Sequence, residues 1–453
     1  MERLTAEDRL VLWPDELWPQ DIGALAVLDG AGRLLDPDGR FRAGTVRQAV
    51  EARLHLVPRF RQVLHVPRPG LGGPLWADAP SFDLADHVRV TGVPAPGDEA
   101  ALLRVTEQLR RRRLDRSRPL WEMWFLTGLP ERRIGLFARV HHAIADGIAG
   151  VATLGAFLDA APDAPAGPAR SWTPAPVPPA RSLLADNLRR QAAGLGGAVS
   201  ALARPGATAR QVRDASSAMR GIFSAPPTPR TSLDQMVGAD RSLAVIRGNL
   251  DLARQVAHRH GAKVNDILLA VTAAGLRGLL CGRGEPVDNL ALPVYVPVTL
   301  RPVQHREQAR GNLVGQMVVP LPLGEPDCGL RLEQIAAEAA RQKASSHPSL
   351  GTMFRSRLAR RALPALLSRH PVSVTTADVP GPPLPAYFAG ARVLEVFPVL
   401  PLIANVTIGV GALSYAGQLN ITVVADRDAV PDLDTFTAAA RSGLRALCEP
   451  VSA

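Results

Sequence analysis

The chain has 453 residues, which is too long for one ordinary core and indicates two or three domains. Hydrophobic residues make up 46% and charged residues 21%, a globular composition in which no apolar run reaches the roughly 18 residues of a membrane-spanning helix. The net charge of +10 fits either a basic solvated surface or attraction to an anionic lipid surface or a phosphorylated cofactor.

The first predicted domain, residues 1–160, mixes strands and helices. IGALAVLDG (22–30) is a short apolar run ending in Asp-Gly, which predicts a buried strand and a turn. Residues 45–64 have helical spacing until Pro58 interrupts it, and EALLRVTEQLRRRRL predicts a second amphipathic helix. WEMWFLTGL and RIGLFARVHH predict two paired strands around the turn PERR.

Residues 161–230 are predicted to be a linker followed by a helical insert. The stretch 161–180 contains seven prolines, which exclude a regular helix or sheet ladder. Leucines then recur at helical spacing over 182–204, with arginines among them. Such a helix either packs against the protein or lies on a lipid surface.

The second predicted domain, residues 231–453, again mixes both kinds of element. Residues 251–280 predict a helix, a turn at Gly261 and a long apolar helix. LALPVYVPVTL, GQMVVPLPL and ARVLEVFPVLP predict strands. A hairpin is expected at Ala416-Gly417, followed by a last helix.

Cysteine usage and the N-terminal residues bear on location. Cys281, Cys328 and Cys448 form no C-x-x-C pair, and MERLTAEDRL has no apolar signal core, so we expect a cytoplasmic protein with reduced thiols. Neither zinc-finger spacing nor a basic strand with interleaved aromatics is present, so nucleic acid is not an expected partner.

The stretch HHAIADG (141–147) carries the chemistry. A neutral imidazole can take a proton from a hydroxyl as its oxygen attacks an acyl carbon, which contributes roughly 10²–10⁴-fold in rate. Asp146 can hold a tight loop through an ion pair, and Gly147 lets the chain turn. No G-x-S-x-G nucleophile pattern is present, so direct transfer from an activated acyl donor is expected.

A histidine pair can also bind a metal or serve a purely structural role. Side chains of adjacent residues on an extended segment point to opposite sides, and no third ligand lies at metal-site spacing, so no metal is expected. One histidine of the pair is expected to be structural.

The chain resembles the bacterial wax ester synthase/diacylglycerol acyltransferase family over essentially its full length. The matching segments, besides HHAIADG, are LDRSRPLWE (114–122), FDLADHVR (82–89), GAKVNDILLAV (261–271), VPVTLRP (296–302), GNLVGQMVVPLP (311–322), VPGPPLPAYFAGARV (379–393) and LNITVVADRD (419–428). The histidine motif is shared with chloramphenicol acetyltransferases and condensation domains. The resemblance implies an α/β (α+β) fold of two chloramphenicol-acetyltransferase-like domains, each a mixed sheet with helices, and an active-site channel at their interface.

The resemblance also implies roles for individual residues. His142 matches the catalytic base and His141 its structural companion, while Asp146 and Gly147 match the aspartate and glycine of the loop. Asn265 is expected to help hold the oxyanion. Pro119, Leu120 and Trp121 are expected to shape the acyl channel, and Asp266 is expected to contribute to substrate binding. Arg61 is the expected ion-pair partner of Asp146.

Two departures from the family pattern concern substrate choice. Ala377-Asp378 stands where members commonly have Ser-Asn, and Gln20-Asp21 stands where they often have Met-His. A changed lining could select an unusual acceptor alcohol.

The implied activity is acyl-CoA-dependent transfer of a fatty acyl group to diacylglycerol, a long-chain alcohol or both, giving triacylglycerol or wax ester. Acyl-CoA is then a substrate, with no cofactor or metal, and peripheral association with the inner membrane or lipid droplets is expected. One alternative is a condensation-type acyltransferase acting on carrier-protein thioesters. Another is a non-catalytic lipid-binding homologue, although a lipid-binding shell has no need of a base.

Overall fold

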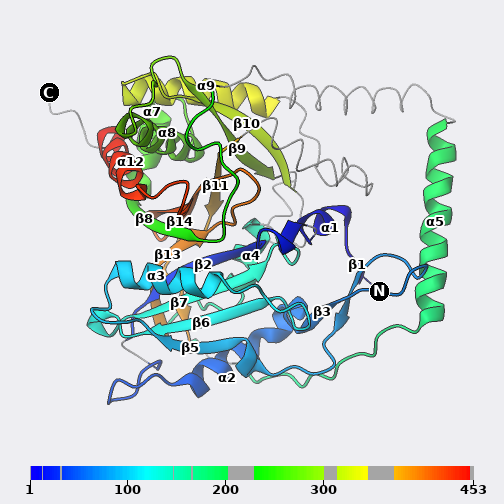
Figure 1. Ribbon diagram of the computed structural model, residues 1–453. Helices are drawn as coiled ribbons and strands as arrows, with labels where there is room; N and C mark the ends of the chain where they lie inside the picture. Colours follow the sequence, from blue (N-terminus) through cyan, green and yellow to red (C-terminus); the bar gives the residue numbers. More distant parts are fainter. Residues whose placement is uncertain are drawn as a thin grey trace.

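The computed structural model describes residues 2–12, 14–30, 33–145, 147–164, 167–202, 229–299, 314–344 and 372–448. Two six-stranded mixed sheets, each with its own helices, form the body of the molecule (Figure 1). This two-sheet α/β architecture confirms the fold class expected from the sequence.

The first sheet has the strand order β12-β13-β2-β7-β6-β5. Its strands are β12 (Tyr387–Phe388), β13 (Ala391–Val399), β2 (Asp21–Leu28), β7 (Ile134–His141), β6 (Trp121–Thr127) and β5 (Val88–Gly92). The predicted pair β6–β7 is antiparallel, and only β5 and β6 run parallel. Every residue of β7 is buried, because α2 (Ala43–Arg53) lies over one face of the sheet and α3 (Glu99–Arg110) over the other. A small third sheet is formed by β1 (Glu2–Arg3), β4 (Leu75–Asp78) and β3 (Gln62–His65).

The second sheet has the strand order β10-β9-β11-β14-β15-β8. Its strands are β10 (Val314–Pro322), β9 (Ala291–Thr299), β11 (Val374–Pro380), β14 (Ile408–Tyr415), β15 (Gln418–Asp426) and β8 (Arg241–Asn249). The predicted hairpin joins β14 to β15, and Ala416 (φ 46°) and Gly417 (φ 82°) both take the left-handed conformation that its tight turn requires.

Four helices pack against the second sheet: α7 (Leu250–Arg259), α8 (Val264–Gly282), α9 (Cys328–Ala344) and α12 (Leu433–Cys448). A Cβ on Gly278 of α8 would lie 2.3 Å from Cβ of Ala439, so glycine is what lets α8 and α12 approach so closely. Among the described residues only α8 is long and apolar enough to cross a bilayer, but 67% of that stretch is buried inside the protein. Its apolar length is therefore explained by its place in the core.

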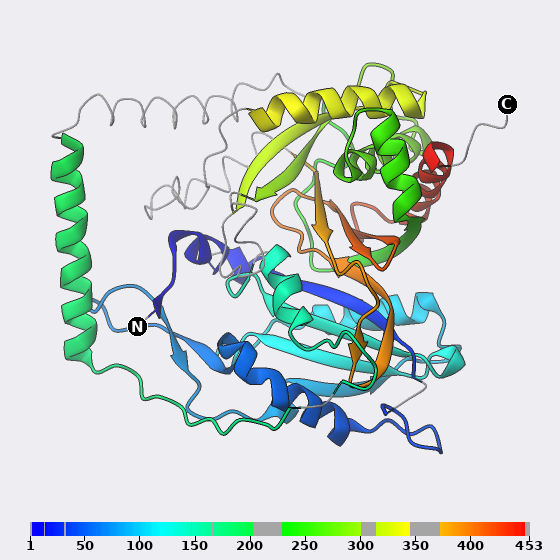
Figure 2. The ribbon, with the colours of Figure 1, turned by 180° about the vertical axis from the view of Figure 1, so that it is seen from behind.

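Strands β12 and β13 come from the second half of the sequence, yet they complete the first sheet. Val399 of β13 pairs with Gly23 of β2, and Figure 2 shows this orange ribbon reaching from one sheet to the other. The predicted ranges 1–160 and 231–453 therefore do not coincide with the two sheets. Without β13, the backbone groups of β2 would be an open sheet edge.

The described residues of the predicted linker and insert lie outside the two six-stranded sheets. Residues 167–179 form no helix or strand, as the prolines predict, and α5 (Ala180–Leu202) then stands apart from both sheets (Figure 1). The described residues of this half also include the short helices α1 (Ala6–Leu12) and α4 (Gly147–Gly155), and α4 begins at the last residue of the histidine motif.

Candidate active site

The histidine pair lies where central strand β7 ends and the chain turns toward α4. His141 is the last strand residue, opposite Asp21 of β2, and its backbone N–H donates to the carbonyl of Leu120 at 2.9 Å. The next N–H, of His142, donates to the carbonyl of Gln20 at 2.7 Å. Backbone bonds to both flanking segments therefore hold the motif at a defined position.

Both ring nitrogens of His141 face protein groups. The backbone N–H of Ala143 donates to Nδ1 at 3.0 Å, so Nδ1 acts as an acceptor. Nε2 lies 3.2 Å from Oδ1 of Asp15, and a carboxylate there favours a proton on Nε2. The ring is 2% exposed. Nδ1 is therefore occupied by the Ala143 N–H and Nε2 faces the Asp15 carboxylate, so neither nitrogen is placed to take a proton from a substrate.

Asp15 is a residue of the site that the sequence analysis missed. It is buried, and besides His141 it accepts the backbone N–H of Gln20 and a guanidinium N–H of Arg116, each at 2.9 Å. Burial alone would raise the pKa of Asp15, but His141, the Gln20 N–H and Arg116 outweigh it and lower the pKa to about 2. No local pattern in LWPDELWPQ signals this role, because its partners lie 101 and 126 positions further along the chain.

His142 lies in the turn after β7 and is only partly buried. The asymmetry expected between the two histidines is present in their surroundings: His141 is enclosed, whereas His142 retains exposed surface. Gly147 is the first residue of α4. Asp146 lies outside the described residues.

Arg61 was the expected ion-pair partner of Asp146. The structure places its guanidinium 5.2 Å from the ring centre of Trp172 and 5.9 Å from that of Phe82. Its side chain is buried, and this desolvation lowers the pKa of Arg61, while Glu51 acts in the opposite direction. The described contacts therefore place Arg61 among aromatic rings, and its pairing with Asp146 stays a prediction.

Strand β11 of the second sheet packs against both α4, which follows the histidines, and α8, which carries the predicted residues Asn265 and Asp266. Asn265 and Asp266 lie in the first turn of α8, where Asp266 accepts the N–H of Lys263 at 2.8 Å. Burial raises the pKa of Asp266. On β11, burial and the nearby Asp266 together raise the pKa of Asp378 to about 6.

Asp21, which stands where family members often have histidine, belongs to a buried ion network. Arg139 precedes His141 by two positions on β7, so both side chains lie on the same face of the sheet. Arg139 is 1% exposed and lies 3.4 Å from Asp21 and 2.8 Å from Glu122. An aspartate at position 21 is therefore neutralised by a buried arginine directly beside the motif.

The three residues predicted to shape the acyl channel lie at the start of β6. Leu120 and Trp121 are fully buried, and the ring of Trp121 stacks between Phe60 at 4.5 Å and His87 at 4.6 Å. Pro119 and Trp121 also line a cavity of about 270 Å³ whose other lining residues are mostly charged. These surroundings fit a packing role for Trp121, and the role of the three residues in an acyl channel stays a prediction.

Within the described part of the chain, no group of three histidine, cysteine, aspartate or glutamate side chains is placed to hold a metal ion. The groups that the structure places at the site are an imidazole, backbone donors and the side chains at the start of α8.

Comparison with known proteins shows the family of the chain. The wax ester synthase/diacylglycerol acyltransferase catalytic domain matches residues 4–268, and the C-terminal domain of the same family matches residues 310–447. A probable diacylglycerol O-acyltransferase of Mycobacterium tuberculosis is 30% identical over 91% of this chain and 87% of its own length.

Solved structures show the same fold. A wax ester synthase/diacylglycerol acyltransferase from Marinobacter aquaeolei VT8 superimposes with a TM-score of 0.67 at 23% identity, covering 98% of both chains. The first condensation domain of the calcium-dependent antibiotic synthetase gives 0.62 at 16% identity, covering 100% of this chain and 97% of its own. With its matching family domains and its histidine motif at the end of β7, the chain belongs to the wax ester synthase/diacylglycerol acyltransferase family and is an acyltransferase.

Proposed function

We propose that this enzyme transfers a fatty acyl group from acyl-CoA directly to the hydroxyl of diacylglycerol, a long-chain alcohol or both. The acceptor oxygen forms a bond to the acyl carbon as the carbon–sulfur bond breaks. His142 takes the hydroxyl proton and returns it to the departing thiolate, so the products are an ester and free CoA. Acyl-CoA is consumed as a substrate.

The observation that carries this proposal is the difference between the two histidines. His141 accepts the Ala143 N–H at Nδ1 and faces Asp15 at Nε2, which fits a structural role. His142 follows it in a turn fixed by the Gln20 carbonyl and is only partly buried, as a base that must meet a substrate requires. A neutral imidazole in this position can accept the hydroxyl proton.

The start of α8 is the proposed site of charge stabilisation. Attack on the thioester places negative charge on the former carbonyl oxygen, and a fixed donor there lowers the barrier. Asn265 carries an amide donor in the first turn of α8, where the helix dipole also favours negative charge. Asp266 shares that turn and is proposed to contribute to substrate binding.

The proposed acceptors are poorly soluble in water, which bears on location. We propose a cytoplasmic enzyme that associates peripherally with the inner membrane or with lipid droplets. The basic charge of the chain supports this proposal, because anionic headgroups attract arginine.

The test is to incubate purified protein with palmitoyl-CoA and a panel of acceptors, and to follow free CoA and the ester product. Release of CoA that depends on diacylglycerol or a long-chain alcohol, and is lost in His142→Ala, is the expected result. Turnover only with an acyl carrier-protein thioester would instead indicate a condensation-type enzyme. Lipid binding without turnover of any donor would indicate a non-catalytic homologue.

A further inference from the structure

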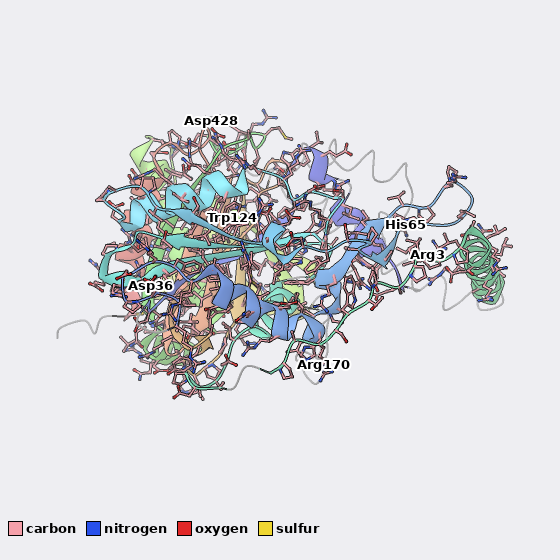
Figure 3. The ribbon with its side chains drawn as sticks, turned by 90° about the horizontal axis from the view of Figure 1, so that it is seen from below. Arg3, Asp36, His65, Trp124, Arg170 and Asp428 are labelled. Carbon is pink, nitrogen blue, oxygen red and sulfur yellow. The ribbon has the colours of Figure 1, made fainter. Side chains whose placement is uncertain are left out.

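Helix α5 is set apart from the two sheets. It follows the extended residues 167–179 and stands beside the body of the molecule in all three views (Figures 1, 2 and 3). Figure 3 shows the labelled residues Arg3 and His65 on the side that faces this helix. A 23-residue helix in this position presents a large part of its surface to the surroundings.

Specific contacts fix how α5 is turned. Nε of Arg3 lies 2.6 Å from Asp186, and Nη2 of Arg3 donates to the carbonyl of Leu183 at 3.1 Å. The Asn187 amide donates to the carbonyl of Gly70 at 2.9 Å. Leu183 is 3% exposed. The inner face of α5, made of Leu183, Asp186 and Asn187, is therefore fastened to the small sheet and its loop.

The outer face of α5, defined by Arg181, Leu184, Leu188 and Arg189, is apolar and basic. Leu184 and Leu188 are one helical turn apart, so their side chains share a face, and they are 43% and 54% exposed. Both arginines are exposed: Arg181 lies within about 60° of each leucine around the helix axis, and Arg189 lies about 100° from Leu188, at the edge of this face. The one acidic residue of α5, Asp186, lies on the inner face and is bound by Arg3 and Arg190.

We infer that the outer face of α5 docks on a phospholipid surface that carries anionic headgroups. The leucines enter the boundary between headgroups and acyl chains, and the arginines bind lipid phosphates. This inference deepens the proposed function, because a lipid acceptor must be collected from such a surface. Because Arg3 and Asn187 fix the inner face, the docked orientation of the enzyme is also defined.

A second copy of the chain fits this face less well. Pairing two outer faces would place arginine against arginine, and two leucines fall short of the roughly 800 Å² that each partner buries in a standard interface. An anionic surface, by contrast, is complementary to the outer face in both charge and polarity.

The first test measures binding of the full-length protein to phosphatidylcholine vesicles with and without phosphatidylglycerol. The variant Leu184→Gln/Leu188→Gln keeps a helix-forming residue at both positions. Its matched control is Leu252→Gln/Leu330→Gln, on α7 and α9, where the leucines are 42% and 53% exposed. We expect at least tenfold weaker vesicle binding in the α5 variant and an unchanged affinity in the control.

The charge is tested separately with Arg181→Gln/Arg189→Gln. Each arginine contributes about fivefold to binding of an anionic surface, so this variant should lose binding to vesicles with phosphatidylglycerol and bind those without it as before. Salt should weaken wild-type binding in the same way.

Three outcomes would overturn the inference: equal vesicle binding by wild type and the leucine variant, an equal loss in the matched control, or a dimer in solution that the leucine variant dissociates. All variants are also assayed with a water-soluble short-chain alcohol, for which turnover should equal that of the wild type. Failure of the wild type to turn over any acceptor would refute the proposed function while leaving the vesicle result intact, so the two failures are distinguishable.

Discussion

Asp15 and His141 meet at 3.2 Å in the protein interior, where the turn Pro14–Glu16 lies against the end of β7. Nε2 of His141 faces this carboxylate, and Nδ1 accepts the Ala143 N–H. A carboxylate near the N-terminus thus contacts a ring more than a hundred positions away, beside the proposed base.

Replacing Asp15 with asparagine is predicted to destabilise the fold. The pKa of Asp15 is lowered from 3.8 to about 2, so its ionised form contributes about 2 kcal/mol of stability that is present above pH 3.8 and lost as the pH falls through about 2. Urea unfolding at neutral pH and in acid should show a difference between Asp15→Asn and wild type that shrinks toward pH 2. The exposed neighbour Glu16 provides the control, Glu16→Gln, and a pH-independent difference would contradict the prediction.

Acyl transfer in Asp15→Asn should fall by up to about 10²-fold, because a displaced His141 shifts the adjoining turn while the base itself remains. Activity equal to that of the wild type would mean that the Asp15 contact has no part in positioning the motif.

The two histidines should respond oppositely to substitution. His142→Ala is expected to cut acyl transfer by roughly 10²-fold or more with little change in melting temperature, since it removes the proton acceptor. His141→Ala leaves the Ala143 N–H and the Asp15 carboxylate without this partner, so it should cost about 1–3 kcal/mol and less in rate. Steady-state rates and thermal melts of both variants decide the assignment, and the reverse pattern would make His141 the base.

Asp146 is predicted to hold the motif loop through an ion pair. Breaking a buried pair costs about 3–5 kcal/mol, so Asp146→Ala should lose folded stability together with activity. Circular dichroism melts alongside the CoA-release assay check this. A variant with a normal melt and no activity would show instead that Asp146 acts in the chemistry.

Asp378 should make the enzyme less stable as the pH rises. Its pKa is raised from 3.8 to about 6, so between these values the folded state binds more protons than the unfolded state, and stability falls with increasing pH. Asp378→Asn should therefore be more stable than wild type by up to about 3 kcal/mol above pH 6, and equal to it below pH 3.8. Urea unfolding across this range tests it against Asp434→Asn, an exposed acid on α12. A constant advantage at every pH would refute the explanation by ionisation.

The amino-acid sequence by itself determined the local structure and the chemistry. Apolar runs predicted β2, β6 and β7, and the Ala416-Gly417 pair predicted the hairpin. The prolines predicted the absence of helix and strand over 167–179. The motif after β7 indicated acyl transfer, and the family comparison confirmed it. These features depend on residues close together in the chain, for which spacing reports burial and backbone conformation directly.

Only the tertiary structure decided which distant segments meet. It placed β13 beside β2, Asp15 beside His141, Asp21 against Arg139 and Asp378 near Asp266. It also showed that the inner face of α5 is held by Arg3 while Leu184 and Leu188 remain exposed. A periodic pattern states that a residue is buried or that a helix has two faces, but it does not name the partner. Packing of the sheets and loops determines which residues become partners. A buried charge or an open strand edge is stable only where a complementary group from another part of the chain lies next to it.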